Sequence, residues 1–134
     1  MALTYSTAVK NARLDAVETA IGPSAVLKIR TGAPPATVAT ASTGTVLSTV
    51  FLASDWMAAA SNGQKAKNGT WEDQSADAGG NAGHFEICAS DGTTVHARGT
   101  VTATGGGGDM TVDNISFAAG QQFTVTGFTL VSGN

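Results

Sequence analysis

The amino-acid sequence predicts a mainly β protein, an antiparallel β-sandwich or jelly-roll with an N-terminal α-helix. Apolar residues recur at helical spacing only before Gly22-Pro23, and beyond it they alternate with polar residues in short runs. Glycine-containing turns separate these runs, as is typical of sandwiches and jelly-rolls. With 134 residues the chain has room for one core. We therefore expect a helical arm over residues 1–23 and a β-sandwich domain over residues 24–134.

The first predicted element is a helix from Ser6 to Ile21, which Gly22-Pro23 ends. One side of this helix carries a row of small apolar residues: Val9, Ala12, Ala16 and Ala20. Alanine allows a helix to approach a flat partner closely. The row is therefore predicted to be the inner face of the helix, packed on its own sheet or on another subunit.

Two strands and a long loop are expected next. Alternation over Ala25 to Thr31 predicts a strand with one polar face, and Thr45 to Leu52 predicts a strand buried on both faces. Between them, the loop from Thr31 to Thr43 is rich in Pro, Ala and Thr and includes Pro34 and Pro35. Because it has few charges to desolvate, this loop is predicted to contact a partner.

A hairpin is predicted around Ser90-Asp91-Gly92. A three-residue loop pairs Ile87 with Val95, so that the apolar faces of both strands agree. A two-residue turn would instead place Ile87 opposite His96, and a one-residue slip moves every side chain to the other face. The three-residue register is therefore preferred.

The C-terminal part is expected to hold a flexible connector and two strands. Gly105 to Gly108 predicts the connector, and Met110 to Ile115 marks a short strand. The last strand, Gln122 to Val131, changes its buried parity at Gly127, where a bulge would rotate the chain.

Candidate metal ligands occur in the predicted hairpin: His84, Glu86, Cys88 and His96. In the preferred register Glu86 lies opposite His96, and a cross-strand Glu–His pair explains them better than zinc, because the spacing matches no zinc module. Elsewhere, Asp109, Asp113 and Asn114 lack the ligand run of a calcium loop. No metal or cofactor is therefore predicted.

No catalytic motif supports an enzyme. The chain has no Gly-x-Ser-x-Gly nucleophile elbow, and the Gly105 to Gly108 run is not followed by the Lys-Ser/Thr of a phosphate loop. A hydrolase that uses His84, Cys88 and His96 stays an alternative without positive support.

Charge and composition favour a protein that packs against other proteins. Only 13% of the residues are charged and the net charge is −3, so nucleic acid is not an expected partner. The single cysteine, Cys88, excludes an intramolecular disulfide. Without a secretory signal or a run of apolar residues long enough for a bilayer, the protein is expected to be made in the cytoplasm and not to enter membranes.

The two tryptophans, Trp56 and Trp71, lie near predicted loops. Tryptophans in such places are satellite core residues or interface anchors, and carbohydrate-binding proteins also use them. Together with Val9, Ala12, Ala16, Ala20, Pro34 and Pro35, they form the predicted interface set.

Most of the chain after the predicted helix resembles a family of small virion proteins of tailed bacteriophages. The matching stretches are LKIRTGAPP (27–35), GTVL (44–47), KAKNGTW (65–71), GHFEI (83–87), RGTV (98–101), DMTVDN (109–114) and GQQFTVTGFTLVSGN (120–134). The resemblance implies a structural component of the particle, with decoration or cementing of the capsid as the preferred role.

The predicted function is therefore a capsid decoration protein, found in the virion, that binds the assembled major capsid protein and stabilises the head. A homodimer or homotrimer is expected. The alternative is a neck, tail or fibre component whose surface, with Trp56, Trp71 and residues 73–81, binds a host glycan.

Overall fold

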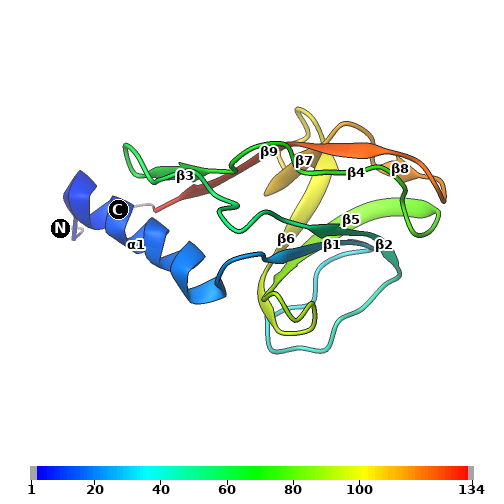
Figure 1. Cartoon of the computed structure of the whole chain (residues 1–134), viewed down its shortest axis with the longest axis horizontal. Helices are drawn as coiled ribbons and strands as arrows, with labels where there is room; N and C mark the ends of the chain where they lie inside the picture. Colours follow the sequence, from blue (N-terminus) through cyan, green and yellow to red (C-terminus); the bar gives the residue numbers. More distant parts are fainter. Residues whose placement is uncertain (1–2, 133–134) are drawn as a thin grey trace.

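The computed structural model describes residues 3–132, a mainly β chain with one N-terminal helix and one curled, mixed sheet (Figure 1). The strand order is β2-β1-β5-β6-β7-β9-β3, while β4 pairs with β9 and β8 with β5. The elements are α1 (Thr7–Ile21), β1 (Val26–Thr31), β2 (Val46–Phe51), β3 (Gln64–Ala66), β4 (Glu72–Asp73), β5 (Gly80–Cys88), β6 (Val95–Ala103), β7 (Met110–Val112), β8 (Ser116–Phe117) and β9 (Phe123–Val131).

The sheet curls into two layers that face each other across the core. One layer holds β2, β1, β5 and β6, and the other holds β7 and β9 with their short neighbours (Figure 1). Phe85 of β5 meets Phe128 of β9 edge to face, with ring centroids 5.4 Å apart. The expectation of a wholly antiparallel fold is wrong at one place, because β6 and β7 are parallel and join both layers into one hydrogen-bonded path.

The connection between β6 and β7 is unusually short. Parallel neighbours normally need a crossover of a dozen or more residues, but here only residues 104–109 intervene. A Cβ on Gly106 or Gly108 would lie 2.7 or 2.9 Å from side-chain atoms of Thr102, and the Gly108 N–H donates to Thr102 Oγ1. The run expected to be a flexible connector is therefore a packed turn that needs glycine for close approach.

The hairpin between β5 and β6 differs from the predicted register by two residues. Ile87 pairs with Ala97 and Glu86 with Arg98, and the Ala89 N–H donates to the Thr94 carbonyl across a longer loop. A shift of two residues leaves each side chain on its original face. The alternation of apolar residues therefore fits both registers, and it cannot distinguish them.

The predicted face switch in the last strand is confirmed. Phe123 and Val125 are buried before Gly127, Phe128 is buried after it, and the register with β7 shifts at this point. The bulge lets one strand bury an aromatic residue on each side of Gly127.

Helix α1 packs on its own chain, along β3 (Figure 1). It begins at Ser6, whose Oγ accepts from the Val9 N–H, and ends at Gly22. Leu14 and Ile21 are its buried residues. The alanine row does not pack on the protein's own sheet, because Val9, Ala12, Ala16 and Ala20 are all exposed, and the other predicted partner, another subunit, stays a prediction. The helix instead turns a mixed face, with Asn11, Asp15 and Glu18, toward the loop before β3.

Lys65 explains this orientation. Its side chain is 2% exposed, and its ammonium group bonds to Asp15 at 2.7 Å, to Glu18 at 2.9 Å and to the Ala58 carbonyl. Burial opposes the charged form, but the bonds to Asp15 and Glu18 outweigh it and raise the pKa of Lys65 above its ordinary value. A buried charge needs such partners, so the acidic side of α1 must face inward.

Replacing this lysine should loosen the helix. We expect Lys65→Ala to lower the free energy of unfolding by about 1–3 kcal/mol, because Glu18 loses its partner in a partly buried place. The measurement is chemical denaturation followed by tryptophan fluorescence. Lys67→Ala is the matched control, because the Lys67 ammonium bonds to the Gly69 carbonyl near the surface, and its effect should stay within about 0.5 kcal/mol. Equal losses in both variants would contradict the role of Lys65.

Candidate interaction surface

The outer face of α1, defined as Val9, Ala12, Ala16, Val17 and Ala20, is the first candidate surface. Its members are exposed, and the side chain of Val9 keeps 42% of its accessible area. The Arg13 guanidinium on this side lies over the ring of Tyr5, 5.0 Å from its centre. An apolar row on a firmly docked helix is typical of a surface that another protein covers.

The second candidate surface is the strap, defined as residues 32–45, which crosses the outer side of β1, β5 and β6 (Figure 1). It contains no charged residue. Arg98 holds it from below: one guanidinium nitrogen donates to the carbonyls of Thr37, Val38 and Thr40. Arg30 donates to the carbonyl of Gly44 at the far end. A loop without secondary structure is thus fixed by side chains of the sheet.

Glu86 is the centre of this arrangement. Its side chain is 1% exposed, and its two oxygens bond to Arg30 and to Arg98, the latter at 2.7 Å. Ser42 of the strap donates to the same carboxylate at 2.6 Å. Burial favours the neutral acid, but the bonds from Ser42, Arg98 and Arg30 prevail and hold the pKa of Glu86 below its ordinary value. The pair predicted between Glu86 and His96 is therefore wrong, since Arg98 takes that place.

The other candidate metal ligands do not converge with Glu86. His84 is buried and its Nδ1 lies 2.9 Å from the Gly32 carbonyl, whereas His96 is exposed. Cys88 is buried, which raises the pKa of its thiol. Within residues 3–132, no group of three or more His, Cys, Asp or Glu is placed to hold a metal ion. Of the four residues, His84 and Glu86 thus support the strap, through the Gly32 carbonyl and Ser42.

The structure places the prolines and the tryptophans of the predicted interface set in different environments. Pro34 and Pro35 are half-buried in the strap and line a shallow pocket of about 380 Å³ with Arg98 and Thr100. They stay available to a partner.

Trp56 and Trp71 are 1% and 2% exposed. Their rings lie 6.0 Å apart in the core, and Trp56 donates its indole N–H to the Gly22 carbonyl. Their buried side chains therefore cannot anchor a partner or bind a glycan, which corrects the expectation for both.

Phe51 is an exposed residue that the sequence did not indicate. It was expected inside a strand buried on both faces, but 81% of its side chain is accessible on β2, the edge strand of the sheet. Continuous apolar runs predict burial, and only the place of the strand in the sheet shows that one face is open. Phe51, at this edge of the sheet, is therefore a further exposed apolar residue that a partner could cover.

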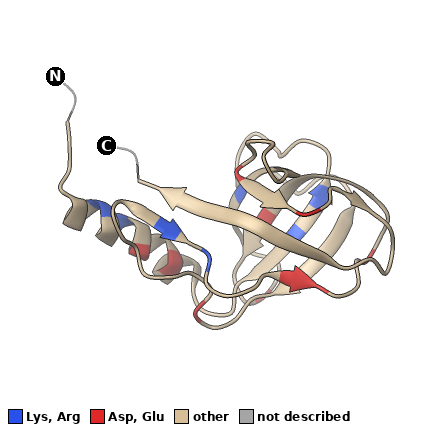
Figure 2. Ribbon diagram, turned by 90° about the horizontal axis from the view of Figure 1, so that it is seen from above, with Lys and Arg blue, Asp and Glu red and all other residues tan. Residues whose placement is uncertain are grey.

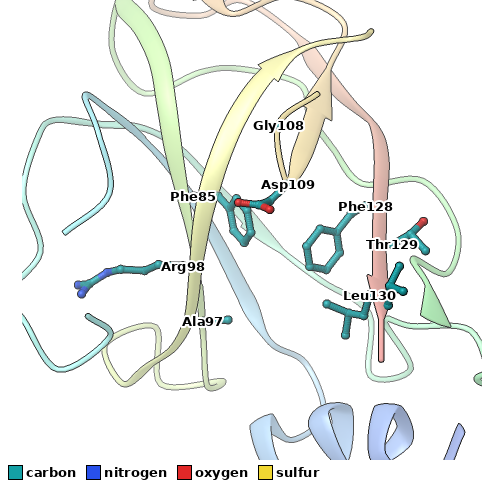
Figure 3. A pocket seen from close by; sticks show the side chains of 9 residues that line it. Phe85, Ala97, Arg98, Gly108, Asp109, Phe128, Thr129 and Leu130 are labelled. Carbon is teal, nitrogen blue, oxygen red and sulfur yellow. The ribbon is translucent and has the colours of Figure 1, made fainter. Parts of the chain in front are cut away.

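A groove between β6 and β9 is a further feature that the sequence did not reveal (Figure 3). Its volume is about 550 Å³, and Phe85, Ala97, Phe128 and Leu130 form most of its apolar lining. In Figure 3 the side chain of Arg98 points away from it, toward the strap. The groove is therefore open and largely without charge.

No protein-family model, curated protein or solved structure matches this chain. Among the described residues, no helix is long and apolar enough to cross a membrane. Charged residues are sparse and scattered along the ribbon (Figure 2). The functional argument therefore rests on the exposed surfaces of the protein.

Neutralising Glu86 should release the strap. We expect Glu86→Gln to lower the free energy of unfolding by about 2–4 kcal/mol at neutral pH, because two arginines lose their partner in a buried place. Exposed Glu72, changed to Gln, is the control and should cost less than about 0.5 kcal/mol.

The stability lost in Glu86→Gln should also depend on pH. Because the folded pKa of Glu86 is depressed, its stabilisation is present above the unfolded value of about 4.3 and disappears as the pH falls through the folded pKa. The difference between wild type and Glu86→Gln, measured by denaturation at several pH values, should therefore shrink below about pH 4. A constant difference down to pH 2 would contradict this account.

Proposed function

We propose that this protein is a structural subunit of a larger assembly, and specifically a capsid decoration protein of a tailed bacteriophage that binds the assembled coat lattice. The outer face of α1 carries this proposal. It is an apolar row that stays exposed, while acidic residues of the same helix face inward and bond to Lys65. The resemblance of stretches within residues 27–134 to small virion proteins is the reason for proposing a phage capsid as the assembly.

The fixed position of the helix supports binding. Lys65, Asn11 and Asp15 hold α1 against the chain through bonds to the loop before β3. A surface that is ordered before binding loses little conformational entropy when a partner covers it. Alanine side chains add no rotamer cost, and they let a flat partner approach closely.

The strap supports the same role. It has no charge to desolvate, its prolines restrict the backbone, and Arg98 fixes its middle from below. With Val38 exposed near its centre, it offers a second apolar contact on another side of the molecule. Two separate contact surfaces suit a subunit that bridges neighbours in a lattice.

The mechanism we propose is mass action. A protein that binds the assembled lattice but not the free coat protein stabilises the lattice by RT ln(1 + [L]/Kd) at each site. At a free concentration one hundred times Kd this amounts to about 2.7 kcal/mol per site. Many copies on one shell then oppose the internal pressure of packaged DNA without any chemical step.

A place in the neck, tail or fibre is the alternative. Such a component would use the same outer face of α1. However, Trp56 and Trp71, which were predicted to bind the glycan, are core residues and cannot contact a sugar. The capsid is therefore the preferred location.

The test is to mix the purified protein with expanded, DNA-free capsids and count bound copies after sedimentation. Saturation at a number of copies that fits the lattice symmetry, together with increased resistance of the capsids to heat, supports the proposal. Absence from capsids and presence on purified tails would contradict it.

A charge on the helix should abolish this binding. We expect Ala16→Glu to weaken capsid binding at least about tenfold, because it puts a carboxylate in the middle of an apolar contact. Glutamate is a good helix former, so the fold should stay intact. The control is Thr93→Glu, in the exposed hairpin loop, which should bind like wild type. Equal binding by both variants would exclude the outer face of α1 as the contact.

A further inference from the structure

The groove between β6 and β9 is a missing piece of the sheet. Strand β7 lies between β6 and β9 and pairs with both, but it has three residues, whereas each of its neighbours has nine. On the β7 side, β6 is paired only at residues 101–103, and β9 only at residues 125–128. Among the described strands, none pairs with residues 95–100 of β6 on that side.

The spacing of the sheet leaves room for one more strand. Two strands that flank a third lie about 10 Å apart, twice the normal strand separation. Below β7 the same two strands continue and the groove of about 550 Å³ lies between them, as Figure 3 shows. Residues 95–100 span about 20 Å, which is the length of a strand of six residues.

The backbone of β6 is directed to accept such a strand. The Thr100 N–H points into the groove, where the carboxylate of Asp109 accepts it at 2.9 Å. The Asp109 side chain thus accepts the hydrogen bond that a backbone carbonyl of a neighbouring strand would otherwise accept. Since N–H directions alternate along a strand, the N–H of Arg98 points to the same side. The groove therefore has hydrogen-bonding groups along its rim and apolar side chains, including Phe85 and Phe128, at its floor.

The lining also defines the charge of the occupant. Asp109 is engaged by Thr100, and the guanidinium of Arg98 bonds to Glu86 and the strap on the other side of the sheet. A groove with strand edges, an apolar floor and one carboxylate, that of Asp109, fits an extended segment without charged side chains whose alternate side chains are apolar.

The chain itself contains such a segment. Residues 1–9 carry no charged side chain, and Leu3, Thr4, Tyr5 and Ser6 alternate between apolar and polar before α1 begins. Leu3 to Ser6 lie before α1 and form no helix or strand, and Leu3 is 67% exposed. In Figure 2 the chain before α1 extends away from the body of the protein.

We propose that the segment around Leu3–Ser6 of a second copy of this chain adds as a strand in the groove between β6 and β9, with Leu3 and Tyr5 facing its apolar floor. The contact joins copies head to tail, because segment and groove are different surfaces. A standard protein–protein interface buries about 1,600 Å² of surface. One short strand buries less surface than this, so the contact between two copies is weak. It becomes strong when copies are held side by side on a lattice. The proposal concerns self-association and holds whether or not the lattice is a phage capsid.

Disulfide trapping between two variants, each with one introduced cysteine, tests it. Full-length Leu3→Cys is mixed with full-length Ala97→Cys or Leu130→Cys, both in the groove, under mild oxidation, and the mixed dimer is measured by mass spectrometry. A disulfide requires Cα atoms about 4.4–6.8 Å apart, so it reports close approach of the two sites. Native Cys88 is buried and contributes little background. Ala118→Cys, in an exposed turn after β8, is the matched control partner.

We expect mixed dimers with at least one groove position and not with Ala118→Cys. Adding Tyr5→Asp to the Leu3→Cys chain should reduce trapping about tenfold, because it brings a charge to the apolar floor, whereas Thr4→Asp should have little effect. Trapping no better than with the control position, or equal loss with both aspartate variants, would overturn the proposal. Circular dichroism of each variant shows that it is folded.

Discussion

The buried ammonium group of Lys65 lies between β3 and α1 and bonds to Asp15, Glu18 and the Ala58 carbonyl. A charge in this place cannot be left without partners, so the acidic side of the helix must face the sheet. The apolar row is consequently turned to solvent. Both proposed contacts depend on this docking, because it presents the outer face of α1 and directs the segment before the helix away from its own body.

A second buried charge organises the opposite side of the molecule in the same way. Glu86 needs Arg30 and Arg98, and Arg98 in turn bonds to three carbonyls of the strap. The low charge content of the chain is thus misleading: several of its charges lie inside and hold loops and helix in place. The surface carries few charges, most of them acidic, and is partly apolar, as expected of a subunit that packs into an assembly.

Local patterns in the sequence predict the helix and most of the strands. The predictions that were wrong concern features that contacts between distant residues determine. The helix ends, the β character after Gly22 and the bulge at Gly127 follow from capping and alternation. The hairpin register does not, because a shift of two residues leaves the faces unchanged. The inward side of α1 was missed because apolar periodicity suggested the alanine row, whereas a lysine fifty residues later pairs with the acidic side. The groove depends on the length of β7 relative to its neighbours, which only the sheet reveals.

The central claim is that the outer face of α1 is open in the free protein and covered in the assembly. Its most direct test is the rate at which a thiol reagent modifies Ala16→Cys, before and after the protein binds capsids. Native Cys88 is buried, so the signal comes from the introduced thiol. We expect rapid modification of the free protein and strong protection on the capsid. Slow modification of the free protein, or an unchanged rate after binding, would contradict the account.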